Sequence, residues 1–298
     1  MFMYIKCYRE GKFFHSFPRR LKQLNKFTPN QLIMAVLPFQ KFFISNGELK
    51  PLKQFIPGKN EGGIYEVLRV VDGIPLFLEE HLERFYQSAE LAGRNIGYSE
   101  GQIKQFLTDL IDKNKILLGN VLVTSKVNLE ALFVPHVYPT TKMYNEGISC
   151  GILKAERENP NAKVFQTTVR YRADQIIAEK GYYEVLLVDH LGKVTEGSRS
   201  NVFFVSGNEL ITPPGRKVLM GITRQKTIKM AGELNIQIVE REVSFSELHN
   251  FSAAFITGTS PKILPIIKID AFKFNSKNET VRLLMNNYDE LINRYLKG

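Results

Sequence analysis

The chain has 298 residues, 44% of them hydrophobic, and a formal net charge of +10. This length allows one large hydrophobic core or two smaller ones. No apolar run approaches the roughly 20 residues that cross a bilayer, so we expect no membrane partner. The two cysteines, Cys7 and Cys150, form neither a disulfide framework nor a metal-binding spacing. We therefore predict a cytoplasmic protein without a metal site.

The positive charge is concentrated at the N-terminus. Residues 1–47 carry eight Lys or Arg side chains and one Glu, so seven of the ten net charges lie in this segment. Excess charge in a tail is usually only solvated, and the rest of the chain is nearly balanced. A nucleic-acid partner is therefore not expected.

Residues 1–40, with many Phe, Lys and Arg side chains, are predicted to form a basic, poorly ordered extension, and Met34 is a plausible alternative start. We predict a small α+β domain over residues 41–135. Its hydrophobic periodicity indicates strands at 41–44, Ile64–Val71 and Pro75–Leu78, and a strand beginning at Val121–Thr124. Turn residues indicate turns at Asn46-Gly47 and Asp72-Gly73, so that Pro75–Leu78 is a return strand. The periodicity also indicates helices at Glu79–Ala92 and Ile103–Asp112.

Residues 136–298 are predicted to form a larger, cofactor-binding domain. Its patterns indicate strands at Ile148–Leu153, Tyr183–Asp189, Lys193–Thr195, Asn201–Val205, Glu209–Thr212, Ile236–Val243, Ala254–Thr257 and Ile263–Lys268, and helices at Thr168–Glu179, Thr223–Leu234 and Thr280–Tyr295. Antiparallel hairpins with helices between them favour an α+β fold of two lobes.

Lys163 lies between a predicted strand and a predicted helix. A lone lysine is more often a solvated surface group. If it were desolvated and near other cations, however, its pKa would fall and its amine would become a nucleophile able to bond an aldehyde.

Glu196 follows a short strand in Thr195-Glu196-Gly197-Ser198. A buried carboxylate keeps a neighbouring ring nitrogen protonated, although an exposed loop glutamate is the commoner case. Ser200 and Asn201 would support it from the same turn, and both are also ordinary turn residues.

Gly221-Ile222-Thr223-Arg224 opens a helix, where free amides bind phosphate. Thr223 could equally be a simple N-cap. Thr259 ends a strand with a hydroxyl that suits the same phosphate. Arg84 offers it two donors, or else forms a solvated pair with Glu80.

An aldehyde-binding amine, a carboxylate for a ring nitrogen and a phosphate-binding turn together match the requirements of pyridoxal 5′-phosphate. From about Phe43 to Asp270 the chain resembles the class IV pyridoxal-phosphate aminotransferases, a group with branched-chain and D-amino-acid aminotransferases and aminodeoxychorismate lyases. The resemblance rests on four segments in order: Tyr65–Val70, Glu80–Phe85, Thr195–Phe203 and Gly221–Arg224.

This resemblance implies the two-lobed fold of that group, called fold type IV, and a homodimer. It assigns the cofactor aldehyde to Lys163 and the pyridine nitrogen to Glu196. The phosphate contacts that it implies are those of Arg84, Ile222, Thr223 and Thr259. The substrates would be amino acids and 2-oxo acids.

The chain departs from this group where the substrate is chosen. Gln166, Thr167 and Thr168 replace the Asn-Tyr that often follows the lysine. The Arg-x-His pair of D-amino-acid enzymes is absent; Ser125-Lys126-Val127-Asn128 stands there, which disfavours D-amino acids. Tyr65, Lys126 and Ser260 are the candidate substrate contacts.

The sequence therefore favours a transaminase acting on a branched-chain L-amino acid or glutamate with a 2-oxo acid. Two alternatives stay open. One is a 4-amino-4-deoxychorismate lyase, which uses the same cofactor scaffold. The other is a protein that binds the cofactor without turnover, which the missing tyrosine motivates.

Overall fold

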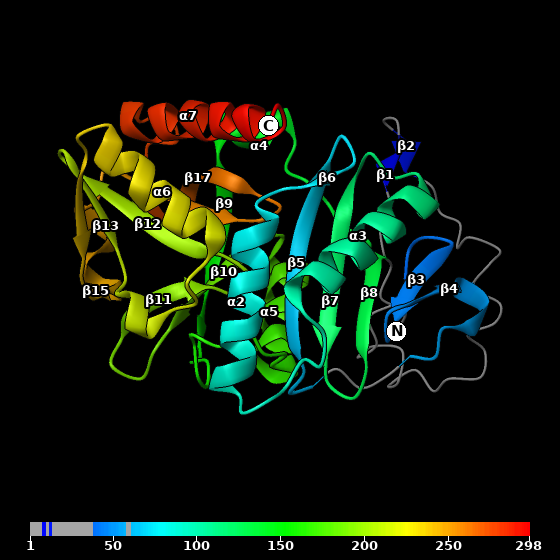
Figure 1. Cartoon of the computed structure of the whole chain (residues 1–298). Coiled ribbons are helices and arrows are strands. Elements are labelled where there is room, and N and C mark those ends of the chain that lie inside the picture. Colours follow the sequence, from blue (N-terminus) through cyan, green and yellow to red (C-terminus); the bar gives the residue numbers. More distant parts are fainter. Residues whose placement is uncertain (1–7, 10–11, 14–37, 58–60) are drawn as a thin grey trace. The chain divides into compact units, whose positions relative to one another are not determined.

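The computed structural model describes residues 8–9, 12–13, 38–57 and 61–298, and it divides the chain into two compact units, Met1–Ala35 and Val36–Gly298. In the first unit the described residues form one antiparallel pair, β1 (Tyr8–Arg9) with β2 (Lys12–Phe13). The rest of the predicted N-terminal extension, up to residue 37, lies outside the described residues. All other elements belong to the second unit (Figure 1).

The first sheet of the second unit is antiparallel, with its strands in the order β4-β3-β8-β7-β5-β6. Asn46-Gly47 and Asp72-Gly73 have positive φ angles of 50°, 79°, 51° and 80°, as two-residue hairpin turns require, and both predicted turns are confirmed. The strands are β3 (Phe42–Ser45), β4 (Glu48–Pro51), β5 (Ile64–Val71), β6 (Ile74–Pro75), β7 (Leu118–Ser125) and β8 (Leu129–Val134), with the 3-10 turn η2 (Leu52–Gln54) after β4.

Two helices, α2 (Leu78–Leu91) and α3 (Glu100–Asn114), pack on this sheet (Figure 1). Helix α2 buries one apolar face, because Leu82, Phe85 and Ala89 join the core cluster with Leu68 of β5. Helix α3 begins with a Ser99 capping box, which satisfies its first amides.

The second sheet is mixed, in the order β14-β13-β12-β16-β17-β9-β10-β11-β15, with β18 on β17. The β9–β10 and β13–β14 pairs are parallel because a helix crosses between their strands. The strands are β9 (Ile148–Lys154), β10 (Glu184–Val188), β11 (Lys193–Gly197), β12 (Asn201–Ser206), β13 (Glu209–Thr212), β14 (Gln237–Glu240), β15 (Val243–Ser244), β16 (Ala253–Gly258), β17 (Lys262–Ile269) and β18 (Phe272–Lys273).

Helices α4 (Thr141–Glu146), α5 (Thr167–Lys180), α6 (Ile222–Glu233) and α7 (Glu279–Tyr295) surround this sheet, with the 3-10 turns η3 (Gly215–Lys217) and η4 (Phe245–Asn250). Successive residues of one strand pack into cores on opposite faces of the sheet, because successive side chains point to opposite faces. Phe203 of β12 packs in the cluster with α6 and α7, whereas Phe204 packs in the cluster with Leu248 of η4.

The predicted elements are present, with four differences. The return strand predicted at Pro75–Leu78 is only Ile74–Pro75, since Phe77 adopts a left-handed conformation (φ 54°) and α2 begins at Leu78. The strand predicted at Ile236–Val243 is two strands, β14 and β15, which pair with different neighbours. Strands β1, β2, β8 and β18 and helix α4 were not predicted. The sheet of the second half contains parallel pairs besides the expected hairpins.

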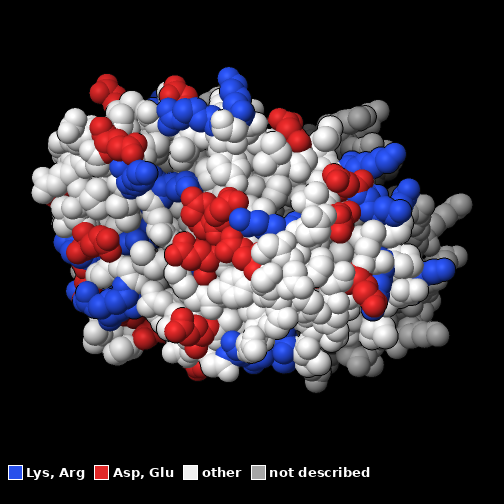
Figure 2. Space-filling view, in the orientation of Figure 1, with Lys and Arg blue, Asp and Glu red and all other residues white. Residues whose placement is uncertain are grey.

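Basic and acidic side chains are interspersed on the face of the molecule drawn in Figure 2. Pairs such as Lys104 with Glu79 and Lys142 with Glu146 neutralise one another at the surface. Among the described residues, no helix combines the length and the apolar character of a membrane span.

Candidate active site

The segment around Lys163 is hydrogen-bonded to the edge of β5. Tyr65 N–H donates to the Lys163 carbonyl at 3.0 Å, and Phe165 N–H donates to the Gly63 carbonyl at 2.9 Å. The amide of Lys163 donates to the Ser88 hydroxyl of α2 at 3.1 Å. Three bonds thus fix the lysine backbone against elements that are distant in sequence.

The Lys163 side chain faces a buried aromatic ring. Its Nζ lies 4.7 Å from the ring centre of Tyr65, and Tyr65 stacks on Phe165 at 4.1 Å. Burial lowers the pKa of Lys163, and the charges of Arg84 and Arg157 lower it further, against the opposing effects of Tyr65 and Glu66. A larger fraction of the amine is therefore neutral, as a nucleophile requires.

The pKa of Tyr65 reflects the same positive surroundings. Burial alone would raise it, but Lys163, Arg170 and Arg157 together bring it down to about 7. The phenol is thus close to ionisation at neutral pH, because the three cations stabilise its anion.

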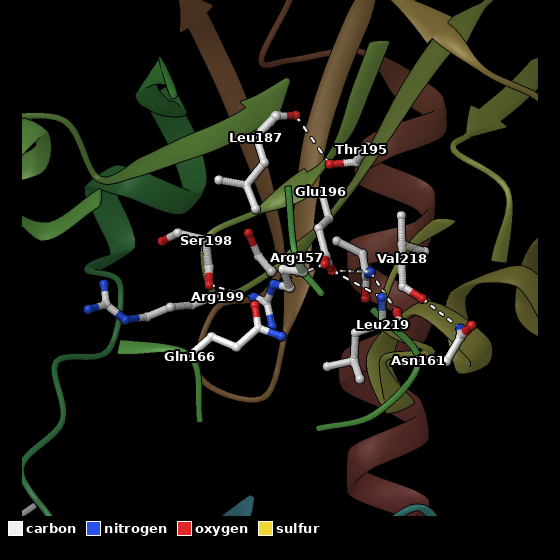
Figure 3. Close-up of polar contacts among 12 residues, drawn as sticks. Arg157, Asn161, Gln166, Leu187, Thr195, Glu196, Ser198, Arg199, Val218 and Leu219 are labelled. Atoms are coloured by element: carbon white, nitrogen blue, oxygen red, sulfur yellow. Dashed lines mark hydrogen bonds and ion pairs between the residues drawn. The ribbon is translucent and has the colours of Figure 1, made fainter. Parts of the chain in front are cut away.

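Glu196, at the end of β11, is 2% exposed and is held by three donors. Arg157 Nε lies 3.1 Å from its carboxylate, Leu219 N–H donates to it at 3.2 Å, and the amide of Asn201 donates at 3.4 Å (Figure 3). Burial raises the pKa of Glu196 although Arg157 opposes the shift. The charge of Lys163 also opposes the shift.

Arg157 is a site residue that the sequence analysis missed. It pairs with Glu196, and its guanidinium also donates to the Ser198 carbonyl at 2.7 Å (Figure 3). It follows β9 in a segment without regular secondary structure, and no motif marks it. Asn161, near Lys163, donates to the carbonyls of Gly215 and Val218 at 2.8 and 2.9 Å and so ties this segment to the turn before α6.

Arg84 is buried and paired with Glu66, so the alternative of a solvated pair with Glu80 is wrong. Its Nε and one terminal nitrogen each donate to Glu66 at 2.7 Å, and the other terminal nitrogen donates to the Met220 carbonyl at 3.0 Å. Two of its five N–H groups remain for a ligand. Glu80 pairs instead with Lys226.

Glu66 is the centre of this buried network. His81 Nδ1 lies 2.8 Å from its second oxygen. Burial alone would raise the pKa of Glu66, but Arg84 and His81 hold it at about 2. Burial lowers the pKa of His81, so the imidazole is neutral and donates to the carboxylate.

The start of α6 offers free amides beside these groups. The amides of Ile222 and Thr223 are the first of the helix, a position at which backbone amides have no partner within the helix. The Thr223 hydroxyl accepts from Tyr288 at 3.2 Å, and Thr223 and Thr259 line one small cavity with Arg69 and His81. The buried hydroxyl of Thr257 has no partner among the described residues.

Two of the predicted residues are placed differently than expected. The Ser200 hydroxyl donates to Glu184 at 2.9 Å rather than to Glu196. Lys126 lies in the exposed turn between β7 and β8. The Ser260 carbonyl accepts from Arg69, which lines the cavity of Thr223 and Thr259, and the Ser260 hydroxyl accepts from Asn120 at 2.8 Å.

A second cavity, lined by several polar side chains, opens beside Tyr65. Its lining residues are Tyr65, Arg157, Val164, Gln166, Val169, Arg170 and Ser198.

The chemistry of these donors fits pyridoxal 5′-phosphate. Lys163 supplies an amine with a lowered pKa, and Glu196 a buried carboxylate for the ring nitrogen. Arg84 and the first amides of α6 supply phosphate donors. The unpartnered Thr257 hydroxyl in the strand leading to Thr259 is consistent with a ligand at this end.

The chain is similar to known proteins over most of its length. The family model of class IV amino-transferases matches residues 63–269. A probable branched-chain-amino-acid aminotransferase of Rickettsia bellii is 28% identical over 70% of this chain and 78% of its own length. A D-alanine aminotransferase of Bacillus licheniformis is 28% identical over 70% of this chain and 79% of its own length. The crystal structure of a putative branched-chain amino acid aminotransferase from Thermotoga maritima superposes with a TM-score of 0.75 and 26% identity, covering 84% of this chain and 95% of that one.

Proposed function

This chain belongs to the class IV aminotransferases, which are pyridoxal-phosphate enzymes, and from that premise we propose that it moves an amino group between a branched-chain L-amino acid or glutamate and a 2-oxo acid. The observation that carries the proposal is that the amine of Lys163 is buried and that this burial lowers its pKa. The name of the Rickettsia bellii relative supports branched-chain substrates.

We propose that Lys163 bonds the cofactor aldehyde and, once the substrate amine has displaced it, moves the substrate α-proton. The cofactor, when bound, supplies an electron sink for the charge left by that proton. A lowered pKa suits both tasks, because the amine has to be neutral to bond an aldehyde and to accept a proton.

We propose that Glu196 holds the protonated ring nitrogen, with Arg157 and Asn201 keeping its carboxylate in place. The proposed phosphate contacts are Arg84, Thr259 and the amides of Ile222 and Thr223. Glu66 orients Arg84 through both of its short hydrogen bonds.

The assembly and location of the protein are also proposals. The family supports a homodimer with its sites near the interface. A cytoplasmic location is supported by Cys150, a buried free thiol, since such thiols are usual in reducing compartments.

Borohydride reduction of the holoenzyme tests the lysine. We expect the cofactor to become fixed to Lys163, as measured by peptide mass spectrometry. Lys163→Ala should carry no label, and its activity should be lower than that of the wild type by at least about a thousandfold. The exposed Lys154 is the control, and Lys154→Ala should retain both. A label on another lysine contradicts the assignment.

An amino-donor screen separates the alternatives. We expect L-leucine, L-valine or L-glutamate to change the cofactor absorbance and D-alanine not to, since Lys126 and its neighbours replace the Arg-x-His pair. Release of 4-aminobenzoate from aminodeoxychorismate would identify a lyase. A bound-cofactor spectrum that no donor changes would identify a protein without turnover.

A further inference from the structure

Arg170 stands at the cavity beside Tyr65 and has no part in the transamination proposed above. It lies in the first turn of α5, and its guanidinium carbon is 5.7 Å from the ring centre of Tyr65. The Nζ of Lys163 is 4.7 Å from the centre of the same ring. One aromatic ring thus contacts both the proposed reacting amine and this arginine.

No carboxylate among the described residues is paired with Arg170. Nor does any Asp or Glu in that part of the chain line the cavity. The other arginine of the cavity, Arg157, is paired with Glu196 at 3.1 Å. The wall beside the proposed reacting amine therefore carries a positive charge that an anionic ligand would balance.

The cavity lining includes several hydrogen-bond donors. Among the described residues that line it are two arginines, and Gln166, Ser198 and Tyr65 add an amide and two hydroxyl groups beside the aliphatic Val164 and Val169. Guanidinium, amide and hydroxyl groups all donate hydrogen bonds that a carboxylate can accept.

We propose that Arg170 is a specificity-determining residue that binds the second carboxylate of a dicarboxylic amino acid or 2-oxo acid, such as glutamate or 2-oxoglutarate. This rests on the proposed transaminase function, in which such an acid is one of the two substrates. A guanidinium suits the task because its paired N–H groups match the two oxygens of a carboxylate.

Calorimetry with an unreactive probe tests the proposal independently of catalysis. Glutarate has two carboxylates but neither an amine nor a ketone, and 4-methylpentanoate has one carboxylate and a branched chain. We expect the holoenzyme to bind glutarate, and Arg170→Gln to weaken that binding by about 10- to 100-fold, the usual effect of losing a hydrogen bond to a charged group. Binding of 4-methylpentanoate should change by less than about threefold.

Arg172→Gln is the matched control, since Arg172 is on the same helix but exposed, where it donates to the Lys154 carbonyl. It should bind glutarate like the wild type. The ratio of kcat/KM for L-glutamate to that for L-leucine should fall in Arg170→Gln and not in Arg172→Gln.

Any of three results would overturn the proposal. The first is that the wild type binds no glutarate, and the second is that Arg170→Gln binds glutarate as tightly as the wild type. The third is that Arg170→Gln loses affinity for glutarate and 4-methylpentanoate equally. Glutarate binding that depends on Arg170 in a protein that transaminates nothing would support the carboxylate site while rejecting the proposed transaminase.

Discussion

Glu66 connects the proposed phosphate end of the site to the interior of the first sheet. Its carboxylate is fully buried and accepts two hydrogen bonds from Arg84 and one from His81. Removing the charge of one partner from a buried pair leaves the other uncompensated, at a typical cost of 3–5 kcal/mol.

We predict that Glu66→Gln lowers the free energy of unfolding by about 3–5 kcal/mol and weakens pyridoxal phosphate binding more than pyridoxal binding, because Arg84 loses its orientation. Denaturant titration and absorbance titrations with the two aldehydes measure the two effects. Glu83→Gln, at an exposed position of α2 next to Arg84, is the control. An equal loss of affinity for both aldehydes would show that Glu66 does not act through the phosphate.

The same carboxylate predicts a pH dependence. The pKa of Glu66 is about 2 in the folded chain, below its ordinary 4.5, so its contribution is present above pH 4.5 and is lost as the pH falls toward 2. The lost stabilisation amounts to about 3 kcal/mol. Unfolding titrations of the wild type and Glu66→Gln between pH 7 and pH 3 test this. The difference in the free energy of unfolding between the two proteins should decrease on acidification. A constant difference would contradict the lowered pKa of Glu66.

At the residue scale, local motifs led to Lys163, Glu196 and Arg84, whose roles remain predictions. Arg157 could not be found in this way, because its importance comes from Glu196, a partner distant in the sequence on strand β11. The same holds for Arg170. The burial that shifts the pKa of Lys163 is equally absent from a single sequence.

At the scale of elements, the turn that begins α6 is packed directly against the support of Glu196. A Cβ on Gly221 would lie 2.2 Å from the side-chain oxygen of Asn201, and two non-bonded atoms cannot approach so closely. Asn201 donates both to Glu196 and to the Leu219 carbonyl, so a side chain at Gly221 would displace the support of the carboxylate.

We predict that Gly221→Ala weakens pyridoxal phosphate binding at least about tenfold and lowers the free energy of unfolding by about 1–3 kcal/mol. The control lies in the same helix: a Cβ on Gly232 meets nothing within 4 Å. Gly232→Ala should stabilise the protein by about 0.5–1 kcal/mol and leave binding unchanged. Wild-type affinity in Gly221→Ala would show that the turn tolerates a shift of Asn201.

Periodicity and turn residues were enough to predict most elements, since these depend on near neighbours in the sequence. The turn at Asn46-Gly47 and the strand Ile64–Val71 are examples. Strand β15 was not predicted as a separate strand, because its two residues form a strand only by pairing with β11. The parallel pairs were missed for a related reason: which strands meet is decided by crossovers, not by the strands' own residues.

At the scale of the whole molecule, residues 36–298 form one compact unit and Met1–Ala35 another. The boundaries of the three predicted domains, at residues 40 and 135, remain a prediction. We propose that the second unit folds and binds the cofactor by itself.

We predict that a chain beginning at Val36 has a Tm within about 2 °C of the full-length protein, since no core residue of the second unit is removed. Its affinity for pyridoxal phosphate should also be unchanged. Thermal unfolding followed by circular dichroism and a cofactor titration measure both. A fall in Tm of about 10 °C would mean that the first unit stabilises the second.

The hydrogen bonds that join the Lys163 segment to β5 have a consequence for synthesis. A polypeptide leaves the ribosome from its N-terminus, so β5 and α2 precede the lysine that they hold, whereas Glu196 and the start of α6 follow it. A nascent chain that has reached Lys163 still lacks the carboxylate and the amides proposed to hold the ring nitrogen and the phosphate. We therefore expect stable retention of the vitamin B6 cofactor only in chains translated beyond the start of α6.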